Sequence, residues 1–371
     1  MHFFCSVADL MNGLQICTKA LAGKTTNEIL ECVLMETDDH SVILTCSDER
    51  ITIVTRVEAE IQHHGRGLLN GKLFSEIVRR MSSGTIEITM SDTFSFQIKS
   101  SSLKMNIAGR DADLFPALPR ISSEQEVALP QNTLKKMIQK TEFAISTENP
   151  REILMGCYLE IVNGDINMVA LDGFRMALYC EKISAVVDRF SAIIPGRAIG
   201  EIGKLLSDDD DAFAQLSMGG NKLHIRLDQT DIYVILVEGD YINYRQIIPN
   251  DFSTVIRINM DDFHHCVDRA SLFAREGGNN LLLMSVQDNI LTVEAHSQVG
   301  DFHEEMDIEQ QGENIRIAFN VRYLSEVVRY MECDVIEMNM KSPISPCIVL
   351  PADEKNYMHM VMPVRTNATN S

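Results

Sequence analysis

Clusters of residues that could bind a metal are few in this chain, and each has a plainer explanation. The run Asp208–Asp211 offers four adjacent carboxylates. Side chains of consecutive loop residues alternate in direction and rarely converge on one cation, so a solvated loop is favoured. The pairs His63-His64 and His264-His265 lack a third donor at ligand spacing. We therefore expect neither a metal site nor a cofactor.

Two further patterns bear on catalysis. Ser101 and Lys104 form an S-x-x-K pattern, but it lies in a strand-like stretch without its companion motifs. Asp172 precedes Arg175 by three residues, and an Asp-Gly pair is first of all a turn. No Walker loop or dinucleotide fingerprint occurs. A protein without intrinsic catalysis is favoured. The alternative is an enzyme, such as a hydrolase using Asp172, and intrinsic turnover would support it.

The elements that would carry these residues repeat at domain scale, about 125–130 residues apart. Apolar residues recur at helical spacing in two series, each with three members. The first series begins after Ser6, after Pro130 and near Met260. The second covers 71–82, 196–206 and 320–332. The spacing predicts six helices in three copies of one unit.

Strand signals repeat at the same interval. Between the two helices of each unit, alternating stretches are broken by polar turns at Asp38-Asp39, Asn163-Gly164 and Asp288-Asn289. Further turns are expected at 91–93 and 219–221. The sequence thus predicts an α+β fold of three repeated domains, each with two helices on antiparallel sheets. Their expected bounds are 1–120, 121–249 and 250–371.

The charge is strongly acidic but unevenly placed. The chain has 33 Lys and Arg against 53 Asp and Glu, a net charge of −20. The six predicted helices hold thirteen basic and ten acidic residues, so the excess of acid lies outside them. If the helices share one surface, that surface is where DNA phosphates are tolerated, while the remainder repels them.

The cysteines and the hydropathy pattern indicate a cytoplasmic protein. The nine cysteines contain no C-x-x-C pair and mostly lie in apolar runs, as reduced, buried thiols do. No stretch reaches the roughly 20 apolar residues that a membrane span requires. We expect no membrane association.

Several segments resemble signatures of one family, the bacterial DNA polymerase III β subunit or β sliding clamp. They are collinear over nearly the whole chain, and only 366–371 runs past the usual end. The segments are Asp113–Leu118, Leu171–Ala177, Glu238–Pro249, Phe319–Leu324 and Met360–Arg365.

The resemblance implies DNA-clamp domains joined head to tail in a homodimeric ring that encircles duplex DNA without sequence specificity. Twelve helices spaced about 9 Å apart, each about 10–12 Å wide, leave an opening of roughly 23 Å, whereas six would not admit a duplex. Basic side chains expected to reach DNA are Lys24, Lys72, Arg79, Arg80, Lys136, Lys140, Arg197 and Lys204.

The resemblance also implies a hydrophobic pocket between the second and third domains for short linear peptides. Leu171 and Ile242 replace the Thr and Pro usual in the family, which predicts a more apolar pocket. Its expected wall is Leu154, Gly173, Phe174, Arg175, Met176, Ile242, Ile247, Asn320, Tyr323, Met360, Val361, Met362 and Pro363. Arg175 and Asn320 are expected to fix the polar parts of the peptide.

The dimer contact implied by the family joins Met105 and Ile107 of one subunit to Leu272 and Phe273 of the other. The partners implied are the polymerase III catalytic subunit, the clamp loader, translesion polymerases and mismatch-repair proteins. A protein-only scaffold that never meets DNA is a third hypothesis, and retention on circular DNA discriminates it.

Overall fold

The computed structural model describes residues 1–23, 25–82, 84–101, 103–119, 121–122, 125–183 and 189–366. The chain forms two compact units. Unit 1 contains residues 1–135 and 197–237, and unit 2 contains residues 136–183, 189–196 and 238–366. No helix among the described residues is both long and apolar enough to cross a membrane.

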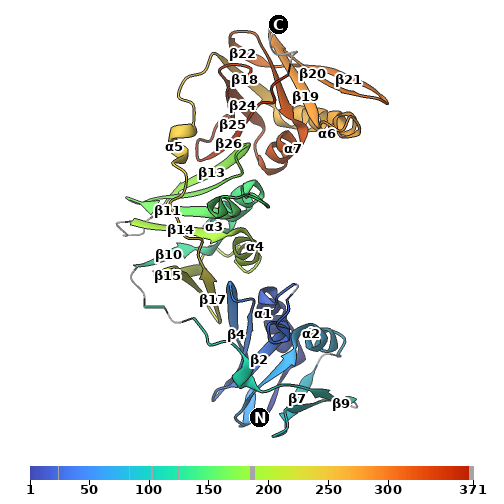
Figure 1. The fold of residues 1–371 in the computed structure, drawn as a ribbon, viewed down its shortest axis with the longest axis vertical. Helices are drawn as coiled ribbons and strands as arrows, with labels where there is room; N and C mark the ends of the chain where they lie inside the picture. Colours follow the sequence, from blue (N-terminus) through green and yellow to red (C-terminus); the bar gives the residue numbers. More distant parts are fainter. Residues whose placement is uncertain are drawn as a thin grey trace. The chain divides into compact units, whose positions relative to one another are not determined.

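Unit 1 is built on antiparallel sheets (Figure 1). One sheet has the order β5 (Glu60–His63), β1 (His2–Ser6), β7 (Thr85–Met90), β8 (Ser95–Ser100) and β9 (Leu103–Ala108). The other has the order β10 (Gln125–Pro130), β15 (Phe213–Gly219), β16 (Lys222–Leu227), β17 (Thr230–Ile235), β4 (Ile51–Glu58), β3 (Ser41–Ser47), β2 (Cys32–Thr37) and β6 (Arg66–Asn70).

Two helices of unit 1, α1 (Val7–Cys17) and α2 (Gly71–Arg79), pack against each other. Ser6 caps α1 by accepting from the backbone N–H groups of Ala8 and Asp9, as its sequence pattern predicts. Gly13 permits close approach to β4, because a Cβ at this position would lie 2.4 Å from Val57 Cγ2. Phe3, Phe74 and Phe96 are fully buried in the core.

Unit 2 is also built on antiparallel sheets. The larger has the order β14 (Arg189–Pro195), β11 (Gly156–Val162), β12 (Asp165–Leu171), β13 (Arg175–Lys182), β26 (Tyr357–Val361), β25 (Cys347–Pro351), β24 (Val335–Met340), β18 (Thr254–Asn259) and β22 (Glu309–Gly312). The smaller has the order β21 (Gly300–Asp307), β20 (Ile290–Ser297), β19 (Leu281–Gln287) and β23 (Ile315–Asn320).

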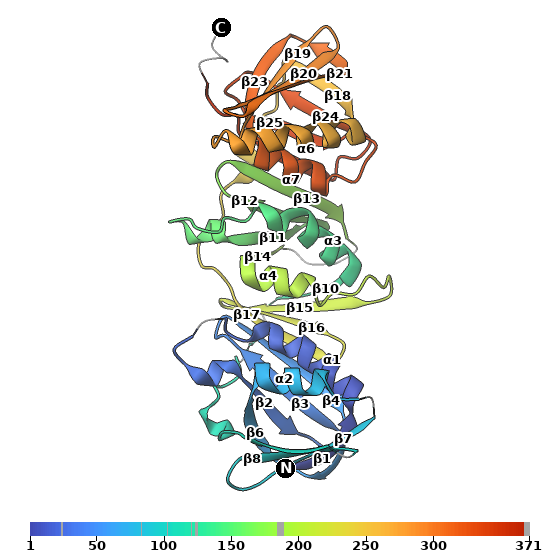
Figure 2. The same ribbon diagram turned by 90° about the vertical axis from the view of Figure 1, so that its right-hand side faces the viewer.

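The helices of unit 2 include α6 (Met260–Glu276) and α7 (Val321–Tyr330), which lie side by side (Figure 2). A short helix, α5 (Tyr244–Ile247), lies outside the sheets. The chain passes between the units within α3 (Gln131–Thr141), at the start of α4 (Gly196–Gly203) and again between residues 237 and 238.

The predicted repeat is visible in these elements. The expected helix pairs correspond to α1 and α2, α3 and α4, and α6 and α7. Asn163, Gly164, Asp288 and Asn289 have positive φ between paired strands, which Asn, Asp and Gly tolerate best. Strands of the middle repeat extend the sheets of its neighbours, because β17 pairs with β4 and β13 with β26. The predicted α+β repeat is therefore confirmed, while the exact domain bounds stay a prediction.

Candidate functional site

The pairing of β13 with β26 brings two of the motif segments together in unit 2. Met176 lies opposite Met360, and Arg175 lies opposite Val361. Beyond the strand, the Met362 N–H donates to the Phe174 carbonyl at 2.8 Å. The tail segment therefore runs beside the strand that follows the Asp-Gly turn.

One face of this sheet carries a hydrophobic cluster. Leu154, Met176 and Met360, all predicted site residues, are buried in it, and Ile242 packs against it half-buried. The cluster also contains Leu171, which was expected to make the pocket more apolar, and residues that were not predicted: Val169, Leu178, Tyr244 and Ile348. Alternation along β12 and β13 puts Val169, Leu171 and Leu178 on this face. The alternating apolar residues of these strands could therefore have predicted their place in the cluster.

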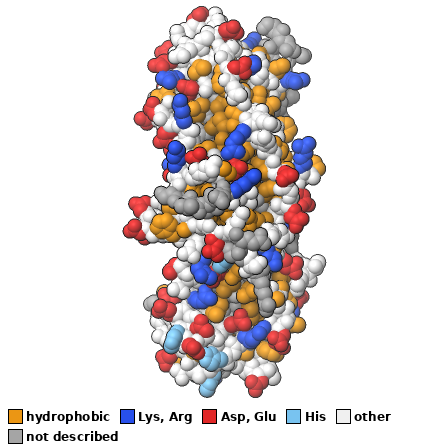
Figure 3. All heavy atoms as spheres, turned by 90° about the vertical axis from the view of Figure 1, so that its left-hand side faces the viewer, with side chains coloured by type: hydrophobic (Ala, Val, Ile, Leu, Met, Phe, Trp, Pro, Cys, Tyr) orange, Lys and Arg blue, Asp and Glu red, His pale blue; other side chains and the backbone are white. Residues whose placement is uncertain are grey.

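Large apolar side chains near this cluster remain exposed. Phe174 is 61% exposed and Ile247 is 39% exposed. The rings of Phe174 and Tyr323 lie 6.5 Å apart and nearly parallel. Hydrophobic side chains gather on the face that carries α5 (Figure 3). We call the cluster together with Phe174, Tyr323 and Ile247 the unit 2 apolar surface.

A tight turn projects Phe174 outward. Gly173 has φ +97°, a backbone conformation that favours glycine. The Asp172 carboxylate accepts from the backbone N–H groups of Phe174 at 2.8 Å and Arg175 at 3.0 Å. The Asp-Gly pair is thus a turn that presents an aromatic ring, as its residue types predict.

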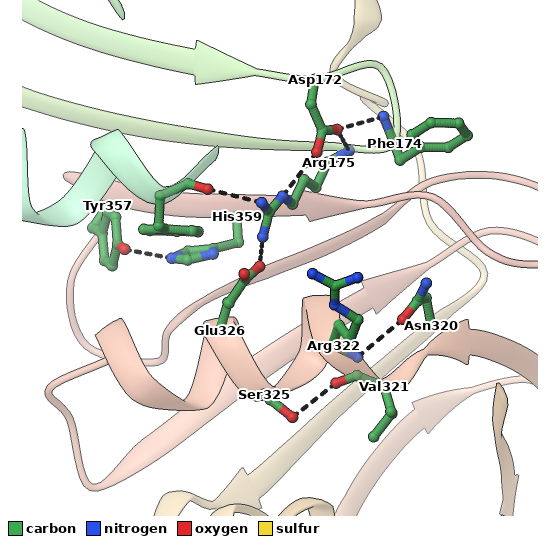
Figure 4. A network of polar contacts seen from close by, with 11 residues as sticks. Asp172, Phe174, Arg175, Asn320, Val321, Arg322, Ser325, Glu326, Tyr357 and His359 are labelled. Carbon is green, nitrogen blue, oxygen red and sulfur yellow. Dashed lines mark hydrogen bonds and ion pairs between the residues drawn. The ribbon is translucent and has the colours of Figure 1, made fainter. Parts of the chain in front are cut away.

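Arg175 is engaged on every side of its guanidinium (Figure 4). Its Nε donates to Asp172 Oδ2 at 3.0 Å, and its Nη2 donates to the Phe143 carbonyl at 2.8 Å. Its Nη1 forms an ion pair with Glu326 of α7. The guanidinium carbon lies 4.9 Å from the Tyr323 ring centroid, within cation–π range. Arg175 therefore supports the aromatic residues, and each of its three guanidinium nitrogens already has a partner within the chain, whereas its contact with a peptide stays a prediction.

The side-chain oxygen of Asn320 is likewise engaged, by the helix that follows it. It caps α7, and its Oδ1 accepts from the Arg322 N–H at 3.0 Å (Figure 4). The tail is tied to the same region, because the Val364 N–H donates to the Ala318 carbonyl at 2.7 Å. Met362 and Pro363 lie in this tail, both half-buried.

A buried histidine lies under this network. His359 of β26 stacks on Phe143 with ring centroids 5.1 Å apart, and its Nε2 contacts the Tyr357 hydroxyl. Burial, together with the charges of Lys140 and Arg175, lowers the pKa of His359 to about 3. The imidazole is therefore neutral at ordinary pH.

Most of the predicted DNA contacts lie on or beside helices and are exposed. Lys72, Arg79 and Arg80 belong to the α2 region, and Arg79 and Arg80 both pair with Glu76, at 2.8 and 2.9 Å. Lys136 is exposed on α3, with its ammonium 5.5 Å from the Tyr179 ring centroid. Lys24 lies outside the described residues.

Arg197 and Lys204 line a cavity of about 1300 Å³ within unit 1, between residues of α1, β4 and α4. Arg197 pairs with Asp48 at 2.5 Å and donates to the Leu21 carbonyl at 2.7 Å. Lys204 pairs with Glu201 at 2.9 Å. These cations are partly neutralised by neighbouring acids.

Lys140 differs from the rest of the predicted DNA-contact set. It is buried, its ammonium donates to the Tyr330 carbonyl at 2.6 Å, and it pairs with Glu332 at 2.9 Å. A buried ammonium with these partners is not available to a phosphate. This position argues against a DNA contact for Lys140 and assigns it to packing between α3 and the end of α7.

Two of the predicted dimer residues lie on an edge strand, and the other two lie on a helix beside an edge strand. Met105 and Ile107 are half-buried on β9, an edge strand of the first sheet of unit 1. Leu272 on α6 is 64% exposed, and Phe273 lies 5.9 Å from Phe302 of the edge strand β21. An exposed apolar residue beside an unpaired strand edge is typical of an interface.

No group of three or more potential metal ligands occurs among the described residues. In the acidic run, Asp208 pairs with Lys135 at 2.6 Å and Asp210 accepts from Asn132 at 2.8 Å. The run therefore makes separate loop contacts instead of converging on one point.

The chain is similar to known proteins over nearly its whole length. Models of the N-terminal, central and C-terminal domains of the DNA polymerase III β subunit match residues 1–119, 128–243 and 245–365. A β sliding clamp of Staphylococcus epidermidis is 29% identical, over 99% of this chain and 100% of its own length. The crystal structure of a putative DNA polymerase III β subunit from Eubacterium rectale is 28% identical, with a TM-score of 0.95, and covers 99% of this chain and 100% of its own. The Bacillus subtilis sliding clamp is 27% identical, with a TM-score of 0.94 and 99% coverage of both chains.

The threefold α+β repeat and its apolar surface thus define a DNA clamp. The chain belongs to the bacterial β sliding clamp family, the β subunits of DNA polymerase III. It is a replication clamp, and a head-to-tail ring dimer is the arrangement of this family.

Proposed function

We propose that this chain acts in replication without catalysis, as one half of a homodimeric ring that tethers a polymerase to duplex DNA. A closed ring stays on DNA by topology, so weak and sequence-independent phosphate contacts suffice and do not impede sliding. The exposed cations Lys72, Arg79, Arg80 and Lys136, with Arg197 and Lys204, are the proposed contacts.

The proposed ring closes between the edge strand β9 of one subunit and the α6–β21 edge of the other. Two features support this proposal. Among the described residues both strands are paired on one side only, and Leu272 and Phe273 place apolar surface beside β21. Burying them against Met105 and Ile107 would satisfy both edges.

The unit 2 apolar surface is the proposed docking site for short linear peptides from replication and repair proteins. The proposed partners are the polymerase III catalytic subunit, the clamp loader, translesion polymerases and mismatch-repair proteins. The observation that carries this proposal is the exposure of Phe174 and Ile247 beside a methionine-containing cluster. Methionine adapts its shape to different partners, which suits a surface that receives several peptides.

Peptide docking is tested by fluorescence anisotropy with a labelled short peptide carrying leucine and phenylalanine side chains. Phe174→Ser should weaken binding at least about ten-fold, as expected for an aromatic residue central to an interface. Phe213→Ser is the matched control, because Phe213 is 54% exposed in unit 1. Equal affinity of wild type and Phe174→Ser would contradict the proposal.

A further inference from the structure

Two arginines, Arg175 and Arg322, lie next to Tyr323, and they differ in whether their guanidinium groups have ion-pair partners. Arg175 is nearly buried, and its donors go to Asp172, Glu326 and the Phe143 carbonyl. Arg322, in the first turn of α7, is exposed. Among the described residues no acid lies within ion-pair distance of its guanidinium, while its backbone N–H donates to Asn320 Oδ1.

The charge around Arg175 disfavours an anionic ligand. One guanidinium faces the two carboxylates of Asp172 and Glu326, so this group carries a surplus negative charge. A peptide carboxylate placed against Arg175 would be repelled by that surplus. His359 adds no positive charge, because its imidazole is neutral.

Arg322 lies beside the same aromatic residues. It stands between Asn320 and Tyr323 in the chain, and its side chain extends from α7 toward the side where Arg175 lies (Figure 4). Its charge acts on the Tyr323 hydroxyl. Burial and Asp172 raise the pKa of Tyr323, and the charges of Arg175 and Arg322 offset part of this rise. The free cation is thus at the edge of the unit 2 apolar surface, next to the Phe174–Tyr323 ring pair.

We propose that Arg322, and not Arg175, determines specificity at this surface by receiving a carboxylate of the docked peptide next to its apolar anchor. The inference rests on the proposed peptide-docking function. The carboxylate has two possible sources, an acidic side chain or the C-terminus of the peptide. Guanidinium groups suit either one, because their planar fork matches a carboxylate. The net charge of the chain, −20, disfavours a peptide carboxylate at most other positions on its surface.

The test compares three labelled peptides with the same apolar anchors. One is amidated and neutral, one is amidated with an acidic side chain beside the anchor, and one is neutral with a free C-terminal carboxylate. Anisotropy titrations use the full-length wild type, Arg322→Ser, and Arg329→Ser as the matched control, since Arg329 is an exposed arginine on the same helix. A fourth protein, Arg322→Glu, reverses the charge.

Arg322→Ser should weaken one or both carboxylate peptides about two- to five-fold, the range for an exposed charge pair, and leave the neutral peptide unchanged. Arg322→Glu should weaken them further, and the effect should fade at high salt. If Arg322→Ser lowers the affinity for only one of the two carboxylate peptides, that peptide identifies whether the carboxylate comes from a side chain or from the C-terminus. If Arg322→Ser changes all three peptides equally, or none, the inference is overturned while peptide docking stands. If the wild type binds none of the three, the proposed docking function fails as well.

Discussion

The guanidinium carbon of Arg175 lies 4.9 Å from the ring centroid of Tyr323, which joins a strand of the middle repeat to a helix of the third. The same guanidinium lies 5.7 Å from the Phe143 ring centroid. Its ion pairs with Asp172 and Glu326 come from both repeats. The Arg175 guanidinium, on a side chain that is 13% exposed, therefore links the two repeats beside the Phe174–Tyr323 ring pair.

Replacing this cation should destabilise unit 2. Arg175→Met leaves Asp172 and Glu326 without their partner, and both side chains are mostly buried. Breaking a buried pair on one side costs about 3–5 kcal/mol, and the partial exposure of Glu326 puts the expected loss near the lower end. Urea unfolding of Arg175→Met and of the control Arg329→Met measures the free energy of unfolding. A loss no larger than in the control would contradict the role assigned to Arg175.

A second buried charge should make unit 1 sensitive to acid. Asp231 on β17 binds His224, Arg226 and Arg56 at 2.8–3.1 Å, and Arg56 comes from β4 of the first repeat. These contacts, led by the His224 hydrogen bond, lower the pKa of Asp231 well below its usual value. A lowered folded-state pKa gives stability that is fully present above the unfolded pKa, about 3.9, and is lost as the pH falls toward the folded value.

Asp231→Asn should therefore lower stability at pH 7 and flatten its decline below about pH 4. Thermal unfolding between pH 2.5 and 7 compares the variant with wild type. Asp301→Asn is the control, because the Asp301 side chain is 75% exposed and pairs with His296, which is exposed as well. Parallel pH profiles for wild type and Asp231→Asn would show that Asp231 does not contribute in this way.

The dimer should depend on the apolar edge of unit 2. Leu272→Asp places a charge at the proposed interface, where desolvation without a partner is unfavourable. We expect a shift from dimer to monomer in sedimentation velocity at micromolar concentration. Leu73→Asp on α2 is the control, since Leu73 is 50% exposed but is not a predicted interface residue. A Leu272→Asp protein that sediments as wild type would exclude this edge as the interface.

Variants of Lys72 and Lys140 should differ in their effects, since Lys72 is a proposed DNA contact and Lys140 is a packing residue. Lys72→Glu should shorten retention on DNA and leave stability nearly unchanged, because Lys72 is exposed. Lys140→Met should lower the unfolding temperature, because it removes contacts to Tyr330 and Glu332. Salt-dependent retention assays and thermal unfolding of both variants test the pair. Loss of DNA retention by a stably folded Lys140→Met would restore Lys140 to the DNA-contact set.

The sequence predicted local structure well because its signals are local. The helix start at Ser6 and the turns at Asn163-Gly164 and Asp288-Asn289 depend on residues a few positions apart, and the structure confirms them. Motif resemblance also indicated that the segments holding Met176 and Met360 belong to one site, and they lie opposite each other.

What the sequence could not predict depends on partners far along the chain. Lys140 resembles any solvated helix lysine until the end of α7 covers it, 190 residues later. Arg175, on strand β13, pairs with Glu326 of the distant helix α7, so its expected contact with a peptide could not be judged from the motif alone. The short helix α5 was also missed, because four residues carry no helical periodicity.

The most direct test of a ring is retention on circular DNA. Labelled protein, loaded onto nicked circular duplex by a clamp loader with ATP, is passed through a sizing column before and after the circle is cut once. Topological binding predicts that the protein stays with the circle at moderate salt and leaves after linearisation, because it slides off the ends. Equal retention on circular and linear DNA, or no retention on either with an active loader, would contradict the clamp.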